Sequence, residues 1–363
     1  MTYLDYQATT PLASEAFEAM LPWLRDQHAN PHSAHREGRA AKAAVEVARE
    51  QVAALLPEGG TVSFTSGATE ALNWAIKGTT GPIVTASTEH AAVLDTVYAE
   101  ARYGRPFTVL PVQPDGLIDL NRAAEVIQPG TGLVAIMLIN NEVGVIQPID
   151  ELAALAHEAG ALFLCDAVQG YGKLDMPQSP DLIAVSAHKI YGPKGVGALW
   201  IREGIKLDPL LNGGGQEPGG RSGTLSPALC AGFGAAARIY VDDVGGEDDH
   251  IIDLWDAAVS RLGPEWTING SIDHRFKGNL NIRRKGLDVA RLMSDLRDIA
   301  FSAGSACASG SGRPSHVLQA IGLGDAEAKS SIRLGFGRYT TEDELVDALT
   351  RIDAAARAQR IAA

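Results

Sequence analysis

The sequence has little cysteine and lacks the patterns that mark secreted, membrane-spanning and nucleotide-binding proteins. Its three cysteines, Cys165, Cys230 and Cys307, form no C-x-x-C pair and are odd in number, which favours a reduced, cytoplasmic setting. No run of about 18 apolar residues occurs, and the N-terminus has no basic-then-apolar signal pattern. Neither G-x-G-x-x-G nor a P-loop occurs, so a dinucleotide or P-loop enzyme is not supported.

Basic residues are fewer than acidic ones. Lysine and arginine number 31 against 44 acidic residues, which gives a net charge of −13. This excess argues against direct binding to nucleic acid or to an anionic membrane. The chain of 363 residues, 45% hydrophobic and 21% charged, has the composition of a globular protein. At roughly 150 residues per domain, its length predicts two domains that need no metal or disulfide to hold a core.

The first part of the chain alternates short apolar runs with helical patterns. Several runs, such as LVAIMLI and DLIAV, are apolar on both faces, as expected for strands covered by helices on both sides. This alternation predicts an α/β fold with a mainly parallel sheet. We expect strands at Val62–Ser66, Pro82–Ser87, Phe107–Val112, Leu133–Ile139, Leu162–Asp166, Leu182–Ser186 and Ala198–Ile201, with helices at Ala68–Lys77, Ala91–Tyr103 and Ile149–Glu158.

After about residue 245 the pattern changes to short strand-like pieces mixed with helices. The acidic, glycine-bearing segment Asp242–Asp249 is predicted to be a linker. Helices are predicted to begin at Asp150 and at Thr341, and Thr341 would form a capping box with Glu344. We therefore predict a large domain over 13–245 and a smaller α+β domain. The smaller domain would combine 1–12 with 246–363. Its strands are expected at Trp266–Asn269, Asn279–Arg283, Ile299–Ser302 and Ser331–Leu334.

Polar or ionisable residues follow five of the seven predicted strands. SGATEA follows the first, and its glycine turn and helix start could cradle a phosphate. Glu89-His90, Asn140-Asn141-Glu142, Asp166 with Gln169, and Ser186 to Lys189 follow the others. Because open α/β sheets bind ligands beyond the carboxyl ends of their strands, five such ends predict one ligand site.

A phosphate cradle, an aspartate, a flat histidine and a lysine together suit pyridoxal phosphate. A lysine amine condenses with its aldehyde, and an aspartate opposite the pyridine nitrogen keeps that nitrogen protonated. Asp166 and Lys189 lie 23 residues apart at the ends of two successive predicted strands. That placement allows them to hold the ring from two sides.

Ten ordered segments of the chain resemble the cysteine desulfurases that feed iron–sulfur cluster assembly, which are class V aminotransferase-like, fold-type I pyridoxal phosphate enzymes. The likeness runs nearly end to end. It rests on YLDYQATTP, NPHSAHREGRAA, FTSGATEALNWAIKG, STEHAAVLDT, INNEVGVIQPI, DAVQGYGKL, SAHKIYGPKGVGAL, GGGQEPGGRSGT, SAGSACASGSGRPSHVL and SIRLGFGRYTTEDEL.

The resemblance implies a role for each matching residue. Lys189 would hold the cofactor, Asp166 would pair with the pyridine nitrogen, and Gln169 with the ring hydroxyl oxygen. His90 would stack on the ring and relay protons. Thr224 would reach the phosphate of the neighbouring subunit, which implies a homodimer. The phosphate would be held by Ala68, Thr69, Ser186 and His188. The substrate carboxylate would be bound by Asn141 and Arg333.

Cys307 would carry the distinctive chemistry. It lies among small residues and glycines in SACASGSGRPSH, within a predicted mobile loop of about 303–314. Cys165 and Cys230, in contrast, are predicted to be buried core cysteines. The family reaction converts L-cysteine to L-alanine and leaves a persulfide on Cys307. The sulfur then passes to an acceptor protein for iron–sulfur cluster, thio-cofactor or tRNA synthesis, and the sequence does not identify that acceptor.

Several features depart from the family or admit another interpretation. Gln7 stands where the family usually has Asn or Ser, Gly312-Arg313 replaces Leu-Glu, and the chain stops at Ala363, where many relatives continue into a scaffold-docking tail. His28, His32 and His35 lie close together, but no cysteine or carboxylate at ligand spacing joins them, so we expect no metal site. Selenocysteine cleavage and transamination are alternative activities, and a cofactor-binding protein without catalytic activity is a further alternative. A transaminase, however, would have no use for Cys307, and an inactive relative should have lost Lys189, Cys307 or Arg333.

Overall fold

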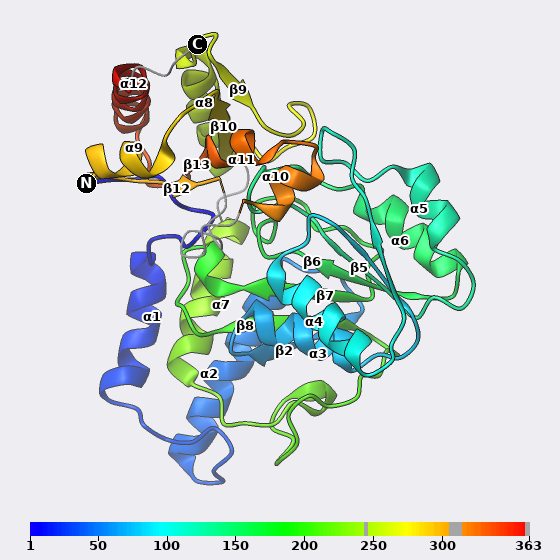
Figure 1. The fold of residues 1–363 in the computed structure, drawn as a ribbon. Coiled ribbons are helices and arrows are strands. Elements are labelled where there is room, and N and C mark those ends of the chain that lie inside the picture. The colour runs from blue at the N-terminus through cyan, green and yellow to red at the C-terminus, as the bar shows by residue number, and fades with distance from the viewer. Residues whose placement is uncertain (243–245, 305–313, 360–363) are drawn as a thin grey trace.

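A computed structural model describes residues 1–242, 246–304 and 314–359 (Figure 1). Its larger sheet has seven strands in the order β2-β8-β7-β6-β5-β3-β4. The strands from β7 to β4 run parallel, while β8 is antiparallel to both of its neighbours. The mainly parallel sheet predicted from the sequence is therefore confirmed. The strands are β2 (Gly60–Thr65), β3 (Ile83–Ala86), β4 (Phe107–Leu110), β5 (Leu133–Met137), β6 (Leu162–Asp166), β7 (Leu182–Ser186) and β8 (Gly197–Arg202).

Helices cover both faces of this sheet. They are α1 (Ser14–Arg25), α2 (Arg36–Ala53), α3 (Ala68–Lys77), α4 (Ala91–Arg102), α5 (Leu120–Val126), α6 (Ile149–Glu158) and α7 (Pro227–Asp242). Alternate residues of β3, β5, β6, β7 and β8 enter two separate cores, as the pleat of a strand requires. One core joins the sheet to α2, α6 and α7, and the other joins it to α3 and α4.

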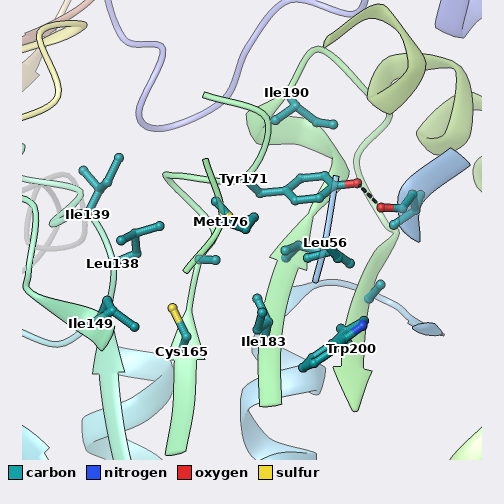
Figure 2. Close-up of a cluster of buried hydrophobic side chains, with 14 of the residues drawn as sticks. Leu56, Leu138, Ile139, Ile149, Cys165, Tyr171, Met176, Ile183, Ile190 and Trp200 are labelled. Carbon is teal, nitrogen blue, oxygen red and sulfur yellow. Dashed lines mark hydrogen bonds between the residues drawn. The ribbon is translucent and has the colours of Figure 1, made fainter. Parts of the chain in front are cut away.

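Figure 2 shows part of the first core. Cys165, Ile183 and Trp200, from three neighbouring strands, point to the same side of the sheet. The Tyr171 hydroxyl above them donates a hydrogen bond of 2.7 Å to the Val52 carbonyl at the end of α2. A buried hydroxyl needs such a partner, and this one ties the segment after β6 to the helix layer.

The second part of the chain forms a smaller α+β unit with its own apolar core, which includes Leu4 from the N-terminus. Its antiparallel sheet has the order β12-β13-β10-β9, and β1 pairs in parallel with β11. The elements are β1 (Thr2–Tyr3), β9 (Trp266–Ile268), β10 (Asn279–Arg284), β11 (Ile299–Ala300), β12 (Ser302–Ala303), β13 (Ser331–Gly335), α8 (Gly246–Arg261), α9 (Val289–Asp295), α10 (His316–Ala320), α11 (Asp325–Lys329) and α12 (Glu342–Ala358).

Two local predictions needed correction and one is confirmed. Thr341 begins α12 as predicted, in a reciprocal capping box with Glu344. Asp150 does not cap α6; the cap residue is Pro148, and the Asp150 carboxylate in the first turn accepts a hydrogen bond from the Ser179 N–H. The expected linker over Asp242–Asp249 is shorter than predicted, because α8 already begins at Gly246. In the part of the chain that the structure describes, no helix is long and apolar enough to cross a membrane.

Candidate active site

A cavity of about 580 Å³ opens at the carboxyl ends of β5, β6 and β7. Most of the residues singled out from the sequence line it together, although they come from distant parts of the chain. These are Ala68, Thr69, His90, Asn141, Asp166, Gln169, Ser186, His188, Lys189 and Arg333. Thr224 does not line this cavity and is exposed in a single chain. Cys307 lies outside the described residues.

Lys189 ends a short 3₁₀ turn (η1, Ala187–Lys189) that follows β7 directly. Its Nζ atom donates hydrogen bonds to the carbonyls of Gln7, at 2.5 Å, and Ala8, at 2.8 Å. Burial, together with the positive charges of Lys173 and Arg333, lowers the pKa of this amine to about 7. Near pH 7 part of this amine is therefore in its neutral form, which is the state that acts as a nucleophile or base.

His90 begins α4, and its position there fixes which ring nitrogen carries a proton. Its Nδ1 atom accepts a hydrogen bond of 3.0 Å from the Ala92 N–H, so in the neutral ring the proton lies on Nε2. Burial lowers the pKa of this imidazole, so the neutral form predominates at pH 7. His90 is therefore a neutral ring with one N–H to donate.

Asp166 ends β6, and the Val168 N–H donates a 3.0 Å hydrogen bond to its Oδ1. Burial raises the pKa of this carboxyl, while His90, that N–H and Lys189 oppose the rise. A positively charged partner in the cavity would stabilise the ionised form further. The adjacent Glu89 is also buried, and burial raises its pKa well above the usual range.

The start of α3 forms a cradle for an anion. Its cap residue is Gly67, so no cap side chain accepts hydrogen bonds from the first N–H groups of the helix, and Gly67, Ala68 and Thr69 line the cavity. The cradle depends on close packing behind it, because a Cβ atom at Gly197 would lie 2.8 Å from the backbone of Gly67. His188 lies on the cavity wall as well, with Nδ1 3.1 Å from the Thr9 hydroxyl, and burial lowers its pKa to about 4.

Arg333 comes from the smaller unit, on β13, and is fully buried. Its Nη2 atom lies 2.7 Å from Oδ1 of Asp5, and its Nη1 donates to the Asn141 carbonyl at 2.9 Å. Its Nε–H is buried and has no partner among the described residues. Because an unpaired buried donor is costly, this N–H is suited to an anionic ligand that enters the cavity.

Two sequence-predicted residues make contacts that the sequence did not suggest. The Gln169 amide donates to the Gln7 carbonyl at 3.0 Å, and that carbonyl also accepts the Lys189 amine. The Gln7 side chain donates to the Gly278 carbonyl at 2.8 Å, so the residue that departs from the family joins the two units. Asp5 was missed altogether. Its only signal was its place in YLDYQATTP, a segment that carried the resemblance without an assigned role.

One of the clustered histidines near residue 30 has a structural role. His35 caps α2, and its Nδ1 accepts a hydrogen bond from the Gly38 N–H at 3.1 Å. Among the residues that the structure describes, no group of three His, Cys, Asp or Glu side chains could hold a metal ion.

Comparison with known proteins identifies the family to which this site belongs. Residues 2–349 match the model of the aminotransferase class-V family. The chain belongs to that family. It is 45% identical over 359 residues to the mitochondrial cysteine desulfurase of Saccharomyces cerevisiae, covering 94% of this chain and 72% of that protein. It is 43% identical over 360 residues to cysteine desulfurase IscS of Rickettsia bellii, covering 94% and 88% of the two chains.

Solved structures agree with this class-V assignment. The NifS-like protein from Rickettsia africae superposes with a TM-score of 0.89 at 32% identity, covering 98% of this chain and 99% of that one. The fold-type I architecture expected from the sequence is thus confirmed. Pyridoxal phosphate is the cofactor of these enzymes.

The residues that line the cavity fit pyridoxal phosphate. An uncapped helix start suits its phosphate, a buried carboxylate suits its pyridine nitrogen, and a lysine that is partly neutral at pH 7 suits its aldehyde. We infer that Thr69, Asp166 and Lys189, respectively, lie in these three positions.

The lowered pKa of Lys189 predicts how cofactor uptake depends on pH. Burial lowers this pKa most, Lys173 and Arg333 lower it as well, and Asp5 and Asp166 raise it, so that the net value is about 7. Because only the neutral amine attacks an aldehyde, the rate of uptake by the cofactor-free protein should rise with pH to about 7 and then level off. Stopped-flow absorbance would measure this rate, and borohydride trapping followed by peptide mapping would locate the modified amine. A rate still rising steeply near pH 10, the range of an ordinary lysine, would contradict the assignment.

Proposed function

We propose that this protein is a cysteine desulfurase that converts L-cysteine to L-alanine and transfers the sulfur to Cys307 as a persulfide. The observation that carries the proposal is the meeting, in one cavity, of the partly neutral Lys189 amine and the buried Arg333 guanidinium, whose Nε–H has no partner among the described residues. An amino acid substrate needs both groups: one to act on its α-amino centre and one to hold its carboxylate. The curated relatives named cysteine desulfurase support the choice of L-cysteine.

Arg333 would set the direction of the substrate. Asp5 already neutralises part of its charge, which lowers the cost of burying the guanidinium without using every donor. The remaining Nε–H, together with the nearby Asn141, would hold the substrate carboxylate at the side of the cavity formed by β13.

Lys189 and His90 would move the protons. When bound, pyridoxal phosphate supplies an electron-withdrawing ring that stabilises negative charge at the substrate α-carbon. The neutral Lys189 amine accepts the α-proton and afterwards returns it. His90, with its proton on Nε2, can donate that proton to the sulfur or to the carbon skeleton as the carbon–sulfur bond breaks.

Cys307 would receive the sulfur. Its thiolate attacks the substrate sulfur; the carbon–sulfur bond breaks as the sulfur–sulfur bond forms, and the carbon skeleton gains the protons that complete alanine. The balance is one L-cysteine and one thiol on the enzyme giving one L-alanine and one persulfide. The persulfide sulfur then passes to an acceptor protein, and iron–sulfur cluster assembly is the use that the relatives support.

Replacing Cys307 by alanine should abolish sulfur transfer, so that alanine formation from cysteine falls at least about a hundredfold, as expected when a nucleophile is removed. Cys230→Ala is the matched control, because burial raises the pKa of that thiol to about 12 and keeps it protonated. Alanine would be measured by chromatography, and the persulfide as a gain of one sulfur atom on the Cys307 peptide by mass spectrometry. Full turnover by Cys307→Ala would refute the desulfurase proposal.

Replacing Arg333 by lysine should raise KM for cysteine by about ten- to a hundredfold, because the hydrogen-bonding fork is lost while the charge remains. Arg284→Lys on the neighbouring β10 is the control; that arginine pairs with Asp353 and does not line the cavity. Steady-state kinetics with both variants, at matched cofactor content, provides the comparison. An unchanged KM in Arg333→Lys would remove this residue from the substrate site.

We also propose a homodimer whose Thr224 completes the phosphate site of the partner. In support, Thr224 is exposed and stands apart from the cavity of its own chain. The native protein should sediment at twice the 38.2 kDa of one chain. Lys189→Ala and Thr224→Ala chains should each bind cofactor poorly alone, whereas mixed dimers should regain one intact site. No regain of cofactor binding in mixed dimers, or a monomer that retains cofactor, would contradict the dimeric site.

Three sequence-based predictions complete the proposal. The division into a large domain over 13–245 and a smaller one from 1–12 with 246–363 is supported by the separate apolar core that unites Leu4 with the C-terminal half. We propose a cytoplasmic location, which the cysteine content and the bacterial relative support. The identity of the sulfur acceptor stays open between an iron–sulfur scaffold and another sulfur carrier.

A further inference from the structure

Tyr191 has a backbone conformation that side chains rarely adopt. Its φ is +65°, and it is the single non-glycine residue with positive φ in the described part of the chain. It stands two residues after Lys189, on the same connection between β7 and β8. Such a conformation persists only where the surroundings hold it, and held strain of this kind gathers at functional sites.

The backbone of Tyr191 is held by the N-terminal segment. Its N–H donates to the Thr10 hydroxyl at 2.7 Å, and its carbonyl accepts from the Ala13 N–H at 2.9 Å. Thr10 also bonds to the His188 carbonyl, through its own N–H at 2.9 Å and through its hydroxyl at 3.1 Å. The turn that carries Lys189 is therefore fixed on one side.

The side chain of Tyr191 holds the turn on the other side. Its buried hydroxyl donates to Oε1 of Glu247 at 2.6 Å and accepts from the Arg338 N–H at 2.9 Å. The Arg338 guanidinium pairs with Oε2 of Glu247 and lies 4.8 Å from the centre of the tyrosine ring. Both hydrogen-bonding capacities of the hydroxyl are thus used, and the Glu247 carboxylate is neutralised.

These partners belong to the smaller unit. Glu247 lies in the first turn of α8, and Arg338 follows β13, five residues after Arg333. The Tyr191 hydroxyl therefore connects the turn that carries the lysine amine with the segment that carries the carboxylate-binding arginine. Any change in this connection alters the spacing between the two groups that a substrate must contact at once.

We propose that Tyr191 is a positioning residue that sets the Lys189 amine relative to Arg333 through the hydrogen bonds of its hydroxyl to Glu247 and Arg338. This inference rests on the proposed function, because it assigns a role in holding the cofactor and cysteine at that same site. Tyr191 itself does not line the cavity, so it acts through the turn and not by contact with substrate.

The test compares Tyr191→Phe with Tyr240→Phe in the cofactor-loaded enzyme. Tyr240 is a matched control: its ring stacks on Tyr191, Arg338 lies over it as well, and its hydroxyl contacts the same Glu247 oxygen, but more weakly at 3.4 Å and from α7. Tyr191→Phe should release cofactor about tenfold faster, weaken the visible circular dichroism of the bound cofactor and raise KM for cysteine about tenfold. Tyr240→Phe should leave all three near their original values. These factors correspond to the loss of one hydrogen bond to a charged group.

Two further variants, Glu247→Gln and the double variant Tyr191→Phe/Glu247→Gln, distinguish a positioning role of the hydroxyl from a general loss of stability. If the hydroxyl acts through Glu247, the double variant should release cofactor no faster than the more severe single variant. Equal effects of Tyr191→Phe and Tyr240→Phe, additive effects in the double variant, or an unchanged release rate in Tyr191→Phe would each overturn the proposal. Should Tyr191→Phe fail to fold, Glu247→Gln against Tyr240→Phe gives the same comparison.

A failure of the proposed function would have a different signature. In that case the original enzyme itself would not form alanine from cysteine, whereas the cofactor release rates of the variants could still be compared. The two ideas are therefore decided by separate measurements on the same samples.

Discussion

The chemistry of this site depends on burying a lysine amine among other positive charges. In water an amine is almost wholly protonated at neutral pH and cannot attack or accept a proton. Burial of Lys189, with Lys173 and Arg333 nearby, lowers its pKa to about 7 and makes the neutral form available. The two carbonyls that accept its hydrogen bonds hold the amine in place without restoring full charge. An amine on an exposed loop would be neither held in a fixed direction nor neutral at pH 7.

The sequence predicts most accurately the elements whose signal is local. The strands Leu162–Asp166 and Leu182–Ser186 have the predicted bounds, because both are continuous apolar runs between turn-forming residues. Helices Ala68–Lys77 and Ile149–Glu158 agree as well, since an apolar stripe at three- and four-residue spacing fixes their extent. The site followed from the same signals, because the carboxyl ends of parallel strands meet on one edge of the sheet.

What the sequence could not predict are contacts between residues far apart in the chain. Asp5 pairs with Arg333 across 328 positions, and no local pattern distinguishes that aspartate from an exposed one. The strain at Tyr191 is equally hidden, because the motif YGPKG suggests glycine, not tyrosine, as the residue with positive φ. The cap of α6 was misjudged for the opposite reason: a nearby Asp150 looked sufficient, but its carboxylate bonds to Ser179.

The N-terminal segment explains how two units make one site. Within six residues, Asp5 neutralises Arg333, the carbonyls of Gln7 and Ala8 receive the Lys189 amine, and Thr10 holds the turn behind it. The Gln7 side chain meanwhile bonds to Gly278 in the smaller unit. This short segment thus fixes groups from both sheets, through the side chains of Asp5, Gln7 and Thr10 and through the backbone carbonyls of Gln7 and Ala8. Backbone contacts of this kind depend on the path of the chain more than on residue type, so Gln7 can replace the residue usual in the family while the Lys189 contact is kept.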